Sequence, residues 1–378
     1  MKQFSLPLMM CGTILTLLLA ACARQPQPPR VEEITFQSGS FTVVGDLRLP
    51  GGTGSFPVVL FVHGSGPAER TGLGSYLPVM ERMLGAGYAT FAWDKPGTGE
   101  STGTIDDQRL IQQRAQIILD AIEVLKRRSD IDLHQIGLWG ISQAGYVIPQ
   151  ALSMSDDIAF MICVSCPGVP GSDQMAFQVT ALALCDGVPE DKADQKASLL
   201  AELSRTQAYE TYEGYLHYRQ VLQALAELAF ASLDPYPVLS EQAWRENAPV
   251  NRRTWNPVEV IEQVRIPVLA IFGDKDRQMD PVQGAHAYRK ALERAGNPKS
   301  RVVLFPKANH GIAVSESGCT EEDGLMFTQY IQSLGYSSVS EAQEAILKDP
   351  YEPGLLSDPP FAPGYLDLIE EWLKDLRR

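Results

Sequence analysis

The sequence feature that most constrains the fold is a recurring pattern. A short apolar run is followed by a Gly-rich or polar loop and then by a helix-forming stretch, and this pattern repeats along the chain. Such runs predict buried strands, because they are short, rich in β-branched and aromatic residues, and bounded by turn residues. Strands that alternate with helices form a mostly parallel sheet covered by helices on both faces. The sequence therefore predicts an α/β fold with strands at Val58–Val62, Ala89–Trp93, Gln135–Trp139, Ile158–Ser165, Val268–Phe272 and Arg301–Phe305.

Other segments do not follow this alternation of strands and helices. Two strand-like runs at Val31–Phe36 and Phe41–Leu49 predict an antiparallel hairpin in front of the parallel strands. Residues 170–260 are rich in Ala, Leu, Glu and Gln and predict a mostly helical insertion. Residues 315–363 also interrupt the strand–helix alternation, and the sequence pattern assigns them no role. An amphipathic helix is predicted at Tyr365–Leu376.

The start of the chain resembles a bacterial lipoprotein signal. A positively charged beginning and a mostly apolar run over Leu6–Leu19 precede Leu19-Ala20-Ala21-Cys22. The apolar run is too short for a membrane span, and an ordinary secretory signal is the alternative. The resemblance implies cleavage before Cys22, a lipid anchor on that cysteine and a Pro-rich tether up to residue 30. Because Ala23 stands where Asp would favour the inner membrane, it also implies an outer-membrane location facing the periplasm.

Composition and net charge limit the classes of molecule that the protein can bind. With 44% apolar and 21% charged residues the chain is globular, and with 32 Lys and Arg against 46 Asp and Glu it carries a net charge of −14. A protein that neutralises phosphates needs a basic face, so we expect no nucleic-acid partner. Oligomeric state cannot be inferred from the sequence.

Four cysteines remain after Cys22 and the preceding segment are set aside. Cys163-Val-Ser-Cys166 has the spacing of a redox pair or half a zinc site, but no second CxxC or His pair completes a metal site. The surrounding residues predict a buried strand instead, so no metal is expected. Cys185 and Cys319 are the other two, and the three possible disulfide pairings stay open.

A candidate nucleophile lies directly after a predicted strand. Gly140-Ile141-Ser142-Gln143-Ala144-Gly145 follows Gln135–Trp139 and precedes a helix-forming stretch. A serine on such a strand-to-helix turn needs small neighbours because the backbone is strained there. The last position of the GxSxG pattern is Ala144, which is still small. A tight structural turn is the alternative interpretation of the motif alone.

A base and an acid follow two later strands, at the same expected edge of the sheet. His310 comes after Arg301–Phe305 and is the one of five histidines placed to act as general base on Ser142. Asp276 follows Val268–Phe272 and is our choice for the carboxylate that orients His310, with Asp274 as the alternative.

At this point the sequence resembles the α/β-hydrolase superfamily, which has the chain order Ser142, Asp276, His310. The region before Ser142 is similar to esterases of the dienelactone-hydrolase kind and to acylaminoacyl peptidases. The resemblance implies that His63-Gly64-Ser65-Gly66 is the oxyanion loop, with backbone N–H donors from Ser65 and Gln143, and that no cofactor is needed. After the lipoprotein signal at 1–21 and the tether at 22–30, it implies a hydrolase core at 31–169 and 261–378 and a helical cap at 170–260.

Three functions stay open at this stage. The first is hydrolysis of small-molecule carboxylic esters through an acyl-enzyme, and the second is cleavage of short peptide amides by the same residues. The third is a binding lipoprotein that keeps only the fold. Within the expected cap, tyrosines recur every third residue, at Tyr209, Tyr212, Tyr215 and Tyr218; ordinary helix packing is favoured over an aromatic wall above the substrate.

Overall fold

A computed structural model describes residues 29–106, 109–205, 211–227, 238–247, 256–349 and 360–377. The predicted lipoprotein signal, Cys22 and Tyr209 lie outside these described residues. Within them, no helix has both the length and the apolar character needed to cross a membrane.

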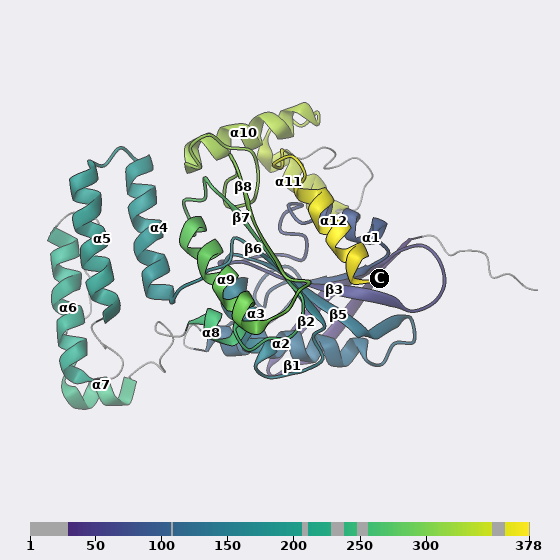
Figure 1. Ribbon diagram of the computed structural model, residues 1–378, viewed down its shortest axis with the longest axis horizontal. Helices are drawn as coiled ribbons and strands as arrows, with labels where there is room; N and C mark the ends of the chain where they lie inside the picture. Colours follow the sequence, from purple (N-terminus) through teal and green to yellow (C-terminus); the bar gives the residue numbers. More distant parts are fainter. Residues whose placement is uncertain are drawn as a thin grey trace, which may run out of the picture.

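One eight-stranded sheet forms the centre of the molecule, in the order β1-β2-β4-β3-β5-β6-β7-β8 (Figure 1). The first hairpin is antiparallel, β2 pairs antiparallel with β4, and all later pairs are parallel, which confirms the predicted α/β architecture. The strands are β1 Arg30–Ser38, β2 Phe41–Leu49, β3 Phe56–Val62, β4 Ala89–Trp93, β5 Ile131–Ile141, β6 Phe160–Val164, β7 Val268–Gly273 and β8 Arg301–Phe305.

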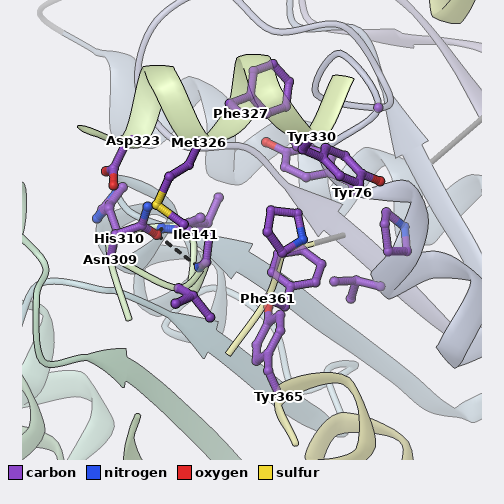
Figure 2. A pocket seen from close by; sticks show the side chains of 18 of the residues that line it. Tyr76, Ile141, Asn309, His310, Asp323, Met326, Phe327, Tyr330, Phe361 and Tyr365 are labelled. Atoms are coloured by element: carbon purple, nitrogen blue, oxygen red, sulfur yellow. Dashed lines mark hydrogen bonds between the residues drawn. The ribbon is translucent and has the colours of Figure 1, made fainter. Parts of the chain in front are cut away.

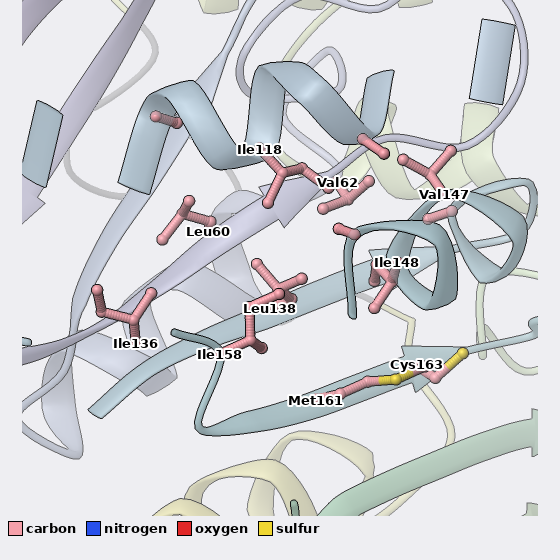
Figure 3. Packing of buried hydrophobic residues seen from close by; sticks show 14 of the residues in the cluster. Leu60, Val62, Ile118, Ile136, Leu138, Val147, Ile148, Ile158, Met161 and Cys163 are labelled. Atoms are coloured by element: carbon pink, nitrogen blue, oxygen red, sulfur yellow. The ribbon is translucent and has the colours of Figure 1, made fainter. Parts of the chain in front are cut away.

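Helices cover both faces of this sheet. One core lies between the sheet and α2, α3, α8 and α9, and Figure 3 shows part of it, where Ile118 of α2 and Ile148 of α3 pack over Leu138 of β5. The other core lies beneath α1 and α12. The helices are α1 Leu77–Gly85, α2 Leu110–Leu125, α3 Ala144–Leu152, α8 Pro257–Ile261, α9 Pro281–Ala295 and α12 Tyr365–Leu376.

Two helical excursions leave the sheet. The larger lies between β6 and β7, and its helices α4–α7 stand beside the sheet in Figure 1. The smaller follows β8 and contributes α10 and α11. Their bounds are α4 Gly171–Cys185, α5 Glu190–Arg205, α6 Tyr212–Glu227, α7 Glu241–Asn247, α10 Thr320–Ser333 and α11 Val339–Lys348.

Both cysteine pairs form disulfides. Cys163 lies in β6 as predicted, but the expectation of an ordinary buried strand missed its bond to Cys166. Ser165 has a positive φ of 48°, which bends the chain after β6 and leaves the two Cα atoms 5.9 Å apart. The second disulfide joins Cys185, at the end of α4, to Cys319, the residue before α10. It therefore ties the two excursions together.

Candidate active site

Ser142 lies on the sharp turn between β5 and α3. Its φ of 59° is in the left-handed region, which a residue with a Cβ adopts only when its surroundings enforce it. The backbone N–H of Ser142 donates to the Val164 carbonyl of the neighbouring strand at 3.0 Å. The side chain is 8% exposed. The turn thus presents one serine at the carboxyl edge of the sheet.

The neighbours of Ser142 explain why alanine is accepted in the motif. A Cβ placed on Gly140 would come within 2.6 Å of the Ala144 Cβ, so the methyl group of Ala144 occupies space that Gly140 leaves open. At Gly145 a Cβ would come within 2.5 Å of the Cys166 Cβ. The turn therefore requires glycine at these two positions, while Ala144 fits.

Asp276 and His310 form a hydrogen-bonded pair. The Nδ1–H of His310 donates to Asp276 Oδ2 at 2.8 Å. The other carboxylate oxygen, Oδ1, accepts from the backbone N–H groups of Gln278 and Met279 at 2.7 and 2.9 Å, and Asp276 is 2% exposed. Asp274, the alternative acid, is exposed, and no hydrogen bond joins it to His310 within the described part of the chain. The geometry assigns the carboxylate partner of His310 to Asp276.

Ser142 and His310 lie at the same edge but are not hydrogen-bonded to each other. Among the hydrogen bonds of the described residues, none involves the Ser142 hydroxyl or His310 Nε2. Hydrogen bonds of this kind are often long without substrate and tighten when it binds. The orientation of the imidazole is fixed through its Nδ1 atom by Asp276.

The loop after β3 comes close to this serine. A Cβ on Gly64 would lie 3.3 Å from the Ser142 Cβ, so the loop backbone packs against the turn. Over the described chain, the backbone N–H groups of Ser65 and Gln143 have no hydrogen-bond acceptor. Two unpaired N–H groups next to a candidate nucleophile are what an oxyanion hole requires.

Two buried cations hold this loop, and sequence reasoning missed both. Arg114 of α2 donates to the carbonyls of His63 and Gly64 and, at 2.7 Å, to Gln143 Oε1. Lys95 donates to the carbonyl of Gly64 at 2.7 Å and to that of Gly66. Burial lowers the pKa of Arg114 to about 10. Burial, and then repulsion from Arg114, lowers the pKa of Lys95 to about 7.

His63 stabilises the start of the same loop. Its Nε2–H donates to the Trp93 carbonyl at 2.6 Å, and the Tyr76 hydroxyl lies 3.3 Å from its Nδ1. Burial lowers the pKa of His63 to about 3, so the ring is neutral near pH 7. Its position and charge state make it a structural histidine, in contrast to His310.

A cavity of about 360 Å³ opens beside His310 (Figure 2). Its walls come from the segment around Tyr76, from Trp139 and Ile141 of β5, from α10, and from the chain leading into α12. Most of the lining is apolar or aromatic, as is usual for small-molecule sites. None of the described residues of the expected cap lines this cavity, and whether 170–260 covers Ser142 stays a prediction. The wall comes from 315–363, to which the sequence assigned no role.

The tyrosine row lies elsewhere. Tyr212 and Tyr215 stack with their ring centroids 5.9 Å apart, and their hydroxyls bond the backbone of Leu239. Neither residue lines the cavity. Helix packing, the favoured interpretation, therefore describes these two tyrosines.

Comparison with known proteins identifies the class. A profile of the alpha/beta hydrolase family matches residues 59–318, and the chain belongs to this family. Esterase EstD of Thermotoga maritima is 23% identical over 302 residues, which cover 78% of this chain and 64% of that protein. The acylamino-acid-releasing enzyme of Rattus norvegicus is 39% identical over 71 residues, 19% of this chain and 9% of that enzyme.

Partial similarity to solved structures is also found. The esterase Pf2001 of Pyrococcus furiosus superposes with a TM-score of 0.46 at 17% identity, over 75% of this chain and 83% of the esterase. Among the curated relatives named above, the chain spans less than two thirds of the length of each.

Proposed function

We propose that this protein is a hydrolase that cleaves carboxylic esters of small molecules through an acyl-enzyme. The observation that carries the proposal is the 2.8 Å pair of His310 and buried Asp276, at the sheet edge that also carries Ser142 on its strained turn. A neutral imidazole held through Nδ1 keeps Nε2 as a proton acceptor, which is what a serine nucleophile needs.

The reaction has two halves. The Ser142 oxygen attacks the ester carbonyl while its proton passes to His310 Nε2, and the tetrahedral oxyanion accepts hydrogen bonds from the N–H groups of Ser65 and Gln143. Collapse breaks the bond to the alkoxide, which takes the proton from His310 and leaves as the alcohol. Water then attacks the acyl-enzyme with the same assistance, and this step releases the acid and restores Ser142.

Ser142→Ala tests the proposal. We expect turnover of 4-nitrophenyl butyrate to fall by about 10⁴-fold or more, and covalent labelling by a fluorophosphonate to disappear. Ser153→Ala is the matched control, since Ser153 is exposed at the other end of the same helix. Undiminished turnover in Ser142→Ala would remove Ser142 from the mechanism. A folded wild-type chain with neither turnover nor labelling would favour the non-catalytic binding protein.

Peptide amides are the second candidate substrate. The sequence likeness to the acylamino-acid-releasing enzyme supports this alternative. A panel of 4-nitrophenyl acyl esters and the corresponding aminoacyl 4-nitroanilides separates the two functions by their kcat/KM values.

We also propose that the protein is lipid-anchored in the bacterial envelope through Cys22, in the outer membrane facing the periplasm. Two disulfides within the described residues support an exported location, because disulfides persist mainly in oxidising compartments. Cys22→Ala should move the protein from the detergent phase to the aqueous phase in Triton X-114 partition. Unchanged partition of the variant would argue against the anchor.

A further inference from the structure

One carboxylate in the cavity wall has no partner. Asp323 lies in the first turns of α10, and its Oδ1 is buried without a hydrogen-bond partner among the described residues. Figure 2 shows Asp323 at the end of the cavity where His310 and Asn309 lie. Resting on the proposed function, we infer that this cavity binds an ammonium group of the substrate and that Asp323 is the residue that recognises it.

The neighbouring carboxylate shows what a structural role on this helix involves. Glu322 accepts hydrogen bonds from the backbone N–H groups of Glu316 and Ser317, at 2.7 and 2.9 Å, and from the Ser317 hydroxyl. These bonds hold the loop that leads into α10. Asp323 makes no such bond, so the fold of the loop does not account for its presence in the wall.

The rest of the cavity does not neutralise Asp323. No Lys or Arg is among the residues that line the cavity in the described chain. The nearby amide oxygen of Asn309 accepts from the N–H groups of Gly311 and Ala313, both at 3.0 Å. A carboxylate in a mostly apolar wall that no Lys or Arg of this wall neutralises attracts a ligand that brings positive charge.

The aromatic lining suits the same ligand. Phe327 and Tyr330 of α10 lie with their ring centroids 6.5 Å apart, and Phe361 and Tyr365 lie across the cavity from them at 5.0 Å from each other. Aromatic faces attract cations, and one carboxylate among aromatic walls fixes where the charge sits. The preferred substrate is therefore an ester or amide that carries an amine together with an apolar group.

Direct binding tests the assignment without depending on catalysis. Calorimetry on the full chain at pH 7 and low salt compares phenethylammonium chloride with 2-phenylethanol, which has a similar shape and no charge. We expect the ammonium to bind about 10-fold more tightly or better, and Asp323→Asn to abolish this preference. Asp323→Leu, whose side chain suits an apolar wall, should abolish it as well.

Glu321→Gln is the matched control, because it removes the same charge from an exposed position on the same helix. It should keep the preference for the ammonium. Equal binding of both probes by the wild type, or a preference that survives in both Asp323 variants, would overturn the inference.

Kinetics then separate this inference from the proposed function. The kcat/KM ratio of 4-nitrophenyl 6-aminohexanoate to 4-nitrophenyl heptanoate should fall by about 30-fold in Asp323→Asn, with heptanoate turnover kept. Heptanoate turnover with an unchanged ratio contradicts the role of Asp323 and leaves the esterase intact. Failure of the wild type to turn over either ester or to react with a fluorophosphonate contradicts the esterase, and the calorimetry still decides the role of Asp323.

Discussion

The two sides of the cavity are built differently. One side is the sheet edge, where Ser142, Asp276 and His310 follow β5, β7 and β8; of these three His310 lines the cavity, and buried hydrogen bonds hold Asp276 and His310. On the other side, α10 and the chain into α12 contribute apolar side chains such as Phe327, which is 41% exposed. A substitution at the buried sheet edge therefore costs more folding stability than one at the exposed helical wall. We infer that chemistry belongs to the first side and choice of substrate to the second.

Among the substitutions that compare these two sides, replacement of an aspartate at the sheet edge has the largest expected effect. Asp276→Asn should lower kcat by about 10³- to 10⁴-fold, because an amide cannot stabilise the imidazolium of His310 and favours the wrong tautomer. Asp274→Asn should leave kcat within about 2-fold, since its side chain is exposed. Steady-state kinetics on a 4-nitrophenyl ester measures both. The reverse result would transfer the role to Asp274.

Arg114→Met is expected to have the next largest effect on this side. The variant removes the buried donor of the His63 carbonyl and one of the two donors of the Gly64 carbonyl, so the loop at His63–Gly66 should shift. We expect kcat to fall by about 10- to 100-fold, with KM changed much less. Arg109→Met, at an exposed position before the same helix, is the control. Equal loss in both variants would show a general effect of charge.

Phe327→Ala tests the opposite wall. It should raise KM for 4-nitrophenyl octanoate by about 3- to 10-fold and leave the acetate ester unchanged, because only the longer chain reaches an apolar wall. Leu325→Ala is the control, since Leu325 is 59% exposed on the same helix and does not line the cavity. A loss of kcat for acetate would mean that the two sides are not separate in function.

The smallest expected effect concerns pH and Lys95. Burial lowers the pKa of Lys95 to about 7 from its ordinary 10.5, so between these values the unfolded chain binds a proton that the folded chain does not. Stability therefore rises with pH across this window, by less than about 1 kcal/mol per pH unit. Lys95→Met should show a flatter rise in urea unfolding between pH 7 and 10. An identical slope in both proteins would contradict the assignment.

The sheet was predictable because its signal is local. A short apolar run predicted β8 at Arg301–Phe305, and an amphipathic pattern predicted α12 at Tyr365–Leu376, both with the bounds that the structure has. The same pattern placed Ser142 and His310 after strands, and the structure brings them to one edge. Strand β5 begins earlier than predicted, at Ile131, so His134 lies within it and not before it.

The cavity wall was not predictable, for a physical reason. Periodicity predicts that a segment is helical, but the loops at its ends decide where the helix packs. The 170–260 segment and the 315–363 segment look alike in this respect, so the sequence did not show that 315–363 contributes to the cavity wall. Arg114 was overlooked because a charged residue in an amphipathic helix is expected on the exposed face. In the structure Arg114 is one of the buried residues of α2 and donates to the His63 carbonyl.

The Cys185–Cys319 disulfide determines which fragments stay covalently linked after the backbone is cut. It spans 134 positions of sequence, and this stretch includes Asp276 and His310. A protease that cuts the backbone once between the two cysteines leaves two fragments that migrate together until a reductant is added. Limited digestion on paired gels, with and without dithiothreitol, can therefore show whether an enzyme nicked in its outlying helices still holds Ser142 and His310 in one molecule.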